Sequence, residues 1–264
     1  MCATIYIYDN LDMWRVSMSL DLKILKAKFI NGKSYDLETI IKDAYKDLQL
    51  RTIKGHNASI QESCIDYLKE AFVNVLNAQP LSDDDFETKH QKICEDFLTK
   101  INSSKTIGKQ EYGKAQKVVN IIFKFLVAHG KWQNEDQCHM PIDSFVLRWL
   151  YKKDRYNGKS WSNISLEEYA QIQTDIKEKI KTPITVGYKN GIAVKNRAEA
   201  DYYVWYITKV EKNYKDTKNS IKKLIKGIDK DDVECISEKT AGEILNELEK
   251  LKKKIENLQF QSKE

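Results

Sequence analysis

The sequence predicts a mainly α-helical protein, with a multi-helix globular body, a short strand or hairpin, and a charged helix at the C-terminus. Only 10 glycines and 3 prolines occur in 264 residues, too few to mark the many turns of an all-β sandwich or barrel. Apolar residues instead recur every three or four positions over long stretches, which is the spacing of one face of a helix. We expect a helical body over residues 1–215 and a charged helical tail over residues 216–264.

Local signals place the elements in chain order. Alternating β-formers predict a short strand over residues 3–8. Ser82 and the acidic residues after it are a start signal for a helix that reaches about residue 101. Pro141 suits the first turn of a further helix, and Ser165 with Glu168 forms a capping-box pattern. In order, the predicted helices cover residues 37–48, 59–77, 82–101, 114–128, 142–152, 165–179 and 199–215.

Three further segments complete this description. Residues 156–163 are expected to form a loop, and an Asn-Gly pair within residues 183–192 indicates a small hairpin. Residues 240–259 carry apolar residues at spacings of three and four between charges, which predicts a short coiled-coil-like helix. The aromatic side chains near the end of the body are expected in the core rather than stacked on a ligand. These are Tyr202, Tyr203, Trp205 and Tyr206.

Charge and cysteine content exclude several classes of protein. The formal net charge is +5, from 44 basic and 39 acidic residues, so a nucleic-acid surface requires local clustering of the basic ones. The five cysteines are odd in number and form no CxxC pair, which argues against a disulfide framework or a structural zinc site. No apolar run approaches the roughly 18 residues of a membrane span, and no signal peptide is evident. We expect a cytoplasmic protein with reduced thiols, no membrane partner, no metal and no cofactor.

Two stretches contain residue types that carry chemistry. The first reads YGKAQKVVNII over residues 112–122, and the second reads HMPIDSFVLRW over residues 139–149. Together they resemble the helix-hairpin-helix/GPD superfamily of DNA glycosylases over residues 113–150. In that superfamily a glycine-containing hairpin leads into a helix with a catalytic lysine and an asparagine three residues later. An aspartate then begins the next helix within a pattern like V-D-[ST]-x-[IV]-x-R.

The resemblance implies excision of a damaged or modified base from double-stranded DNA, extending to Schiff-base lyase activity. Lys117 takes the lysine position and, as a neutral amine, would attack the sugar. Asp143 takes the aspartate position and would stabilise the positive charge that develops on the sugar. The base would first be flipped out of the duplex. The lysine-to-aspartate spacing is closer to the archaeal 8-oxoguanine glycosylase branch than to the endonuclease III branch.

Six more residues receive roles from the same resemblance. Phosphate contacts are expected from the glycine-containing loop and from two basic side chains near it, because backbone amides and cations bind phosphate oxygens. The remaining two residues are expected to line the base pocket. The phosphate-contacting set is Gly108, Gly113, Lys114 and Arg148, and the pocket set is Asn120 and His139.

Other interpretations of the same residues stay open. Lys117 also suits a solvated basic face of a core helix, shared with Lys114 and Lys124. Asp143 also suits a first-turn carboxylate that interacts with the helix dipole. The alternative function is a non-catalytic helical adaptor that binds protein or DNA through residues 240–259.

Overall fold

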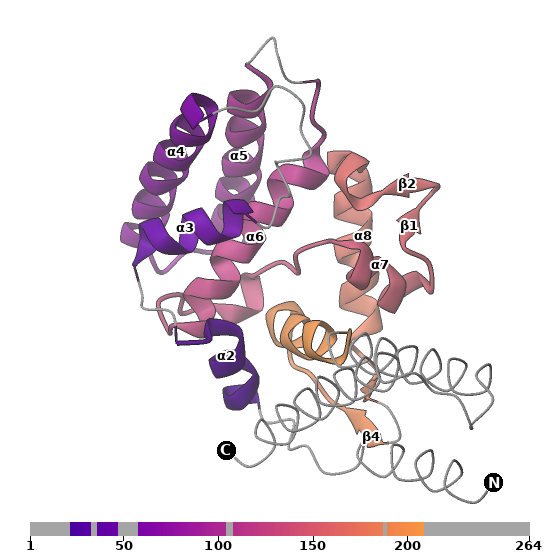
Figure 1. The fold of residues 1–264 in the computed structure, drawn as a ribbon. Coiled ribbons are helices and arrows are strands. Elements are labelled where there is room, and N and C mark those ends of the chain that lie inside the picture. Colours follow the sequence, from indigo (N-terminus) through magenta and orange to yellow (C-terminus); the bar gives the residue numbers. More distant parts are fainter. Residues whose placement is uncertain (1–21, 33–35, 47–57, 104–107, 187–188, 209–264) are drawn as a thin grey trace, which may run out of the picture. The chain divides into compact units, whose positions relative to one another are not determined.

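The computed structural model describes residues 22–32, 36–46, 58–103, 108–186 and 189–208 (Figure 1). Nearly all of them belong to one compact unit, residues 21–186 and 190–205. The unit is mainly helical, which confirms the predicted fold class. The strand expected at residues 3–8, the boundary expected at residue 215 and the helix expected at 240–259 all lie outside the described residues.

The helices from α3 (Leu37–Lys46) onward follow the predicted order, and α2 (Leu22–Ile30) was not predicted. α2 and α3 are followed by α4 (Ala58–Asn77), α5 (Asp83–Asn102), α6 (Tyr112–Ala128), α7 (Ser144–Tyr151) and α8 (Leu166–Lys179). Residues 197–208 are also helical. Two short 3₁₀ helices, η3 (Glu135–Gln137) and η4 (Trp161–Asn163), lie in the connections.

α6 is the central helix of the unit. All but three of its 17 residues are buried, as expected for a helix that is apolar on most of its circumference. It packs against α2, α3 and α5, and also against η4 and α8 (Figure 1). Any residue on α6 is therefore held by several neighbouring elements.

Helices α3, α4 and α5 each bury one apolar face, and these faces form the core with α6. The buried side chains include Ile41, Leu68, Phe72 and Phe97, each essentially inaccessible to solvent. Burial of a side chain of this size contributes roughly 1.5–3 kcal/mol. Tyr202 and Tyr203 belong to the buried core of the unit and Tyr206 is also buried, as predicted, while Trp205 is half-buried.

Two predicted helix starts are confirmed and one is shifted. The Ser82 side chain accepts from the amide of Asp85 at the start of α5, and Ser165 forms a complete capping box with Glu168 at the start of α8. The helix predicted from residue 142 begins at Ser144 instead, so Pro141 lies before it. The reason is that the carboxylate of Asp143 accepts from the amides of Phe145 and Val146 and so acts as the N-cap.

The described part of the chain contains two short hairpins, of which the first corrects a predicted loop and the second was predicted. Residues 156–163 do not form a plain loop, because β1 (Arg155–Tyr156) pairs antiparallel with β2 (Lys159–Ser160). Asn157 and Gly158 have φ of 48° and 80°, the left-handed values of a two-residue type I′ turn. The hairpin expected at 183–192 is confirmed as β3 (Ile184–Val186) and β4 (Lys189–Ile192). Its Asn-Gly pair lies within β4 rather than in the turn.

No helix within the described ranges combines the length and the apolar character needed to cross a bilayer.

Candidate functional site

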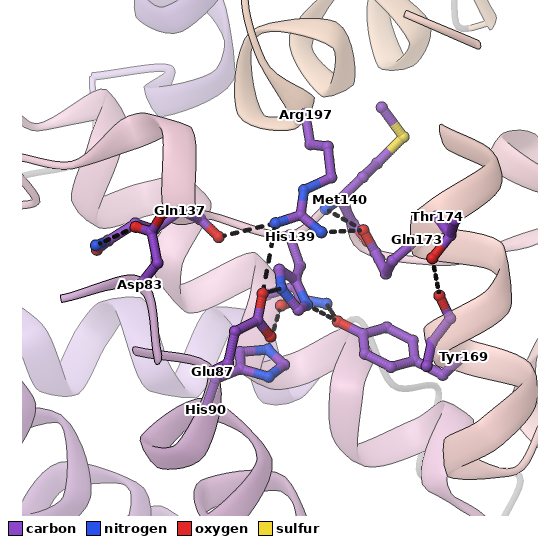
Figure 2. A network of polar contacts seen from close by, with 12 residues as sticks. Asp83, Glu87, His90, Gln137, His139, Met140, Tyr169, Gln173, Thr174 and Arg197 are labelled. Atoms are coloured by element: carbon purple, nitrogen blue, oxygen red, sulfur yellow. Dashed lines mark hydrogen bonds and ion pairs between the residues drawn. The ribbon is translucent and has the colours of Figure 1, made fainter. Parts of the chain in front are cut away.

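A hydrogen-bonded network of polar side chains lies in the core between α5, α6 and α8 (Figure 2). On α5, His90 is 2% exposed and its Nε2 lies 2.7 Å from Asn120 Oδ1 on α6. The amide nitrogen of Asn120 donates to Gln116 Oε1 at 3.1 Å and to the Tyr169 hydroxyl at 2.9 Å. Asn120 is thus fully satisfied by neighbouring side chains.

His139 joins this network from the segment that precedes α7. Its Nδ1 lies 2.6 Å from the Tyr169 hydroxyl and its Nε2 lies 2.8 Å from Glu87 Oε1. The Arg197 guanidinium donates to the backbone oxygen of Gln137 at 3.1 Å and lies 3.8 Å from Glu87. Glu87 has 48% of its side chain exposed, so the network reaches the surface through this carboxylate.

The hydrogen bonds agree with a single protonation pattern. Glu87 can only accept, so Nε2 of His139 carries a proton and Nδ1 accepts from the Tyr169 hydroxyl. Burial lowers the pKa of His90 to about 3 and, together with the charges of Arg197 and Lys177, lowers the pKa of His139 well below its usual value. Burial also raises the pKa of Tyr169. Both histidines are therefore neutral at pH 7.

Two glutamines fix the backbone that leads into α7. Gln116 on α6 donates to the carbonyl of Ile142 at 2.9 Å and accepts from its amide at 3.0 Å. Gln173 on α8 makes the same pair of bonds with Met140, at 2.7 Å and 3.4 Å. Both glutamines are buried, so the polar backbone of this segment is satisfied without secondary structure. The position of Asp143, directly after the segment, follows from this anchoring.

Lys117 lies on α6 and is half-buried. Its ammonium nitrogen is 4.6 Å from the ring centroid of Trp161 in η4, a cation–π contact that stabilises the charged side chain by about 0.5–1 kcal/mol at a partly exposed position. Lys114 is also half-buried, and burial lowers its pKa. The solvated-face interpretation of these lysines is thus too simple, because both side chains are partly covered.

The two glycines of the predicted phosphate loop have different environments. Gly108 is exposed, with nothing near the position of a Cβ. Gly113 is buried, and its amide donates to the carbonyl of Ile164 at 3.1 Å. A Cβ at Gly113 would overlap the backbone oxygen of Trp161, so glycine is needed for the close approach of α6 and η4. The amide of Gly113 already has an acceptor within the protein.

Asp143 and Arg148 lie at the start and on the surface of α7. The Oδ1 atom of Asp143 accepts from two amides, at 2.8 Å and 3.0 Å, which is the helix-terminal role that the sequence left open. Arg148 is exposed, and its guanidinium lies 5.9 Å from the ring centroid of Phe145.

A buried ion pair joins α6 to the helix over residues 197–208. Lys124 Nζ and Asp201 Oδ2 are 2.7 Å apart, with 7% and 6% of their side chains exposed. Burial raises the pKa of Asp201, and the negative charge of Asp143 raises it further. The positive charges of Lys124 and Lys117 lower it. The charges of Lys117 and Asp143 therefore both act on one buried carboxylate.

Around Lys124 the structure places three aromatic rings. The ammonium lies 4.4 Å from the ring centroid of Phe29, 4.9 Å from that of Tyr202 and 5.5 Å from that of Trp205. Since the ring faces are electronegative, they compensate part of the desolvation of the ammonium. This arrangement explains how a lysine is accommodated inside the core.

A run of exposed basic side chains follows the proposed catalytic segment. We call this run the hairpin face, and it consists of Arg148, Lys152, Lys153, Arg155 and Lys159. The register of β1 and β2 places Arg155 and Lys159 on opposite sides of the hairpin. One acidic residue, Asp154, lies among them, and Lys159 pairs with Glu168 at 3.0 Å. The elements that carry these side chains contact one another in sequence, from α7 through β1 and β2 to η4, and η4 packs on α6 (Figure 1).

The structure brings some of the predicted residues together. Asn120 and His139 both bond to the Tyr169 hydroxyl, so they share one environment as expected. Sequence patterns alone did not indicate five other members of this region. A signal for one of them, His90, was present, since it lies on the apolar face of α5 with Phe86, where a polar residue requires a partner. The five residues are Glu87, His90, Tyr169, Arg197 and Asp201.

Comparison of the chain with protein-family models finds no match, and comparisons with curated proteins and with solved structures find none either. Among the residues that the structure describes, no three His, Cys, Asp or Glu side chains are grouped so as to hold a metal ion.

Proposed function

We propose that the protein binds double-stranded DNA through the hairpin face and excises a damaged or modified base with Lys117 and Asp143. The observation that carries the proposal is that Lys117 lies on Trp161 at the end of a continuous series of elements bearing five exposed cations. Clustered lysine and arginine bind DNA phosphates and release counterions. Half-buried aromatic rings beside them, including Trp149 and Trp161, suit stacking on an exposed base.

The chemistry assigned to Lys117 and Asp143 is supported by the connection between α6, which carries the lysine, and the segment that leads into α7. Both charges act on Asp201, and the backbone before Asp143 is anchored to α6 by Gln116. In the proposed reaction Lys117 leaves the Trp161 ring and gives its proton to solvent, and the flipped base takes its place on the ring. The neutral amine then attacks C1′ of the sugar as the N-glycosidic bond breaks, and the base leaves with the bonding electrons and takes up a proton from solvent. Asp143 retains its N-cap bonds and stabilises the developing positive charge.

The phosphate contacts are revised from the predicted loop to the hairpin face. The Gly113 amide is bonded to Ile164, so it has no role in the proposal, whereas Arg148 keeps its predicted role. Lys153, Arg155 and Lys159 take the place of the glycine loop.

Borohydride trapping tests the reaction. The chain is incubated with duplexes carrying 8-oxoguanine, uracil or an abasic site, and covalent adducts and released base are measured. We expect an adduct with the wild type, its loss in Lys117→Ala, and its retention in the control Lys42→Ala, which removes an exposed lysine from α3. Asp143→Asn, which can still cap α7, should fold normally but lose about 10²–10³ in rate. Absence of adduct and of released base on all three duplexes refutes the assigned chemistry.

A salt titration tests the binding surface separately. Lys153→Ala/Arg155→Ala/Lys159→Ala should bind duplex DNA more weakly, with the slope of log K against log salt reduced by roughly 0.9 for each phosphate that the variant no longer neutralises. The control Lys42→Ala/Lys89→Ala/Lys92→Ala removes three lysines from α3 and α5 and should keep the slope of the wild type. Equal slopes in all three proteins would exclude the hairpin face as the DNA-binding surface.

A further inference from the structure

A second basic region forms a pocket near the C-terminal end of α8. Its volume is about 380 Å³, within the range of small-molecule sites. Four cationic residues line it, Lys177, Lys181, Lys195 and Arg197, with a single carboxylate, Asp136. None of these residues belongs to the hairpin face.

The contacts of these charges show which of them face a ligand. Lys181 is paired with Glu178 at 2.7 Å, and Arg197 lies 3.8 Å from Glu87. Asp136 accepts from the side-chain amide of Asn196 at 2.6 Å. Lys177 and Lys195 are exposed, and neither forms an ion pair with any residue in the described part of the chain. The wall of the pocket therefore carries two ammonium groups available to an anion.

The wall of the pocket includes Lys195, Asn196 and Arg197, at the N-terminal end of the helix over residues 197–208. The Asn196 side chain accepts from the amide of Glu199 at 2.8 Å, and the Glu199 carboxylate accepts from the amide of Lys195 at 2.8 Å. This leaves the amides of residues 197 and 198 in the first turn of the helix, where no helical carbonyl can accept from them. Apolar side chains, among them Pro183 and Val194, line another part of the pocket.

We propose that this pocket binds a small phosphorylated molecule, with Lys177 and Lys195 on the phosphate and the apolar wall against the rest of the ligand. Two ammonium groups and helix-terminal amides recognise a phosphate as a multiply charged oxyanion. The pocket also contacts the buried network, because Arg197 lines it and bonds to Gln137. A bound phosphate would offset the positive charges of Lys177 and Arg197, which act on His139, and so would raise the pKa of that histidine.

Calorimetry on the full chain with pyrophosphate and with adenosine 5′-monophosphate tests the site. We expect saturable binding of at least one probe, at least tenfold weakened in Lys177→Glu/Lys195→Glu and unchanged in the control Lys89→Glu/Lys92→Glu. Tighter binding of the nucleotide than of pyrophosphate would assign the apolar wall to the base, and the reverse order would assign recognition to the phosphate. NMR of the His139 ring should show its pKa rise when the probe is added.

Two outcomes overturn the proposal. The first is that neither probe binds the wild type at millimolar concentration, and the second is that the Lys177→Glu/Lys195→Glu variant binds as tightly as the wild type. The site is independent of the hairpin face, since Lys177→Glu/Lys195→Glu should keep duplex binding and the hairpin-face variant should keep pyrophosphate binding.

Discussion

Acidification from pH 7 to pH 5 should destabilise the protein through its two buried histidines. In the unfolded chain each histidine has a pKa near 6.5, whereas in the fold the pKa of His90 is about 3 and that of His139 is also strongly lowered. Between these values the unfolded state binds more protons, so the free energy of unfolding rises with pH and is lost as pH falls below 6.5. At pH 5 the loss is about 2 kcal/mol for His90, and the lowered pKa of His139 adds to it in the same direction.

A loss of about 2 kcal/mol from His90 alone is already large against the 5–15 kcal/mol that stabilises a typical domain. Carboxylates whose pKa is lowered in the fold, such as Glu38 and Glu168, lose their stabilising effect only at more acidic pH. The window from pH 7 to pH 5 is therefore suited to the histidines.

Urea unfolding followed by tryptophan fluorescence at pH 7, 6 and 5 measures the effect. His90→Gln removes one titrating ring, so the decline in stability between pH 7 and 5 should shrink by about 2 kcal/mol, whatever the stability of the variant at pH 7. In the folded wild type, the NMR signals of His90 and His139 should not titrate in this window. Titration of both rings near pH 6.5, or the same decline in His90→Gln, would show that neutral buried histidines are not the cause.

Three substitutions test the packing and capping assignments by urea unfolding. Gly113→Ala should lower the free energy of unfolding by about 1–3 kcal/mol, because the added Cβ overlaps the backbone oxygen of Trp161 in η4. The exposed control Gly108→Ala should have little effect. Similar losses in both variants would contradict the packing role of Gly113. Asp143→Ala should lower the free energy of unfolding by about 0.5–2 kcal/mol because the N-cap of α7 is lost, whereas Asp143→Asn should lower it much less. Equal losses in the two variants would argue against the capping role. Lys124→Met should lower the free energy of unfolding by roughly 3–5 kcal/mol, because it leaves Asp201 buried without its cation. The double variant Lys124→Met/Asp201→Leu should recover most of that loss. If it does not, the loss is due to packing rather than to charge.

The helical framework could be predicted because its signals are local. Ser82 and Ser165 act within three residues of the helix starts that they cap, and the apolar spacing along α4 depends only on its own sequence. The start of α7 was predicted too early because Pro141 and Asp143 both suit a first turn, and only the two amides bonded to Asp143 decide between them. The Asn157–Gly158 turn had a local signal as well, but the strands beside it are two residues each, too short to show alternation.

The candidate site was less predictable because its partners are distant in the sequence. Tyr169 meets Asn120 across 49 positions, and Arg197 reaches Gln137 across 60. No spacing rule relates such pairs, since they depend on how α6, α8 and residues 197–208 pack. The resemblance placed Asn120 and His139 in one environment, but it gave no indication of Glu87, the residue through which that environment meets solvent.

The direction of the hydrogen bonds in the core gives Glu87 an influence beyond its own contacts. Each group donates to the next, from His90 to Asn120, then to Tyr169, then to His139, and finally to the Glu87 carboxylate. Because a carboxylate cannot donate, it fixes the ring tautomer of His139 and, through it, the direction of the Tyr169 hydroxyl. A glutamine at position 87 could donate as well as accept, which would allow the other tautomer of His139. The Tyr169 hydroxyl would then face two donors, because Gln116 Oε1 holds the Asn120 amide in its present orientation. One half-exposed carboxylate and one buried glutamine thereby fix the arrangement of protons in an interior that solvent does not reach.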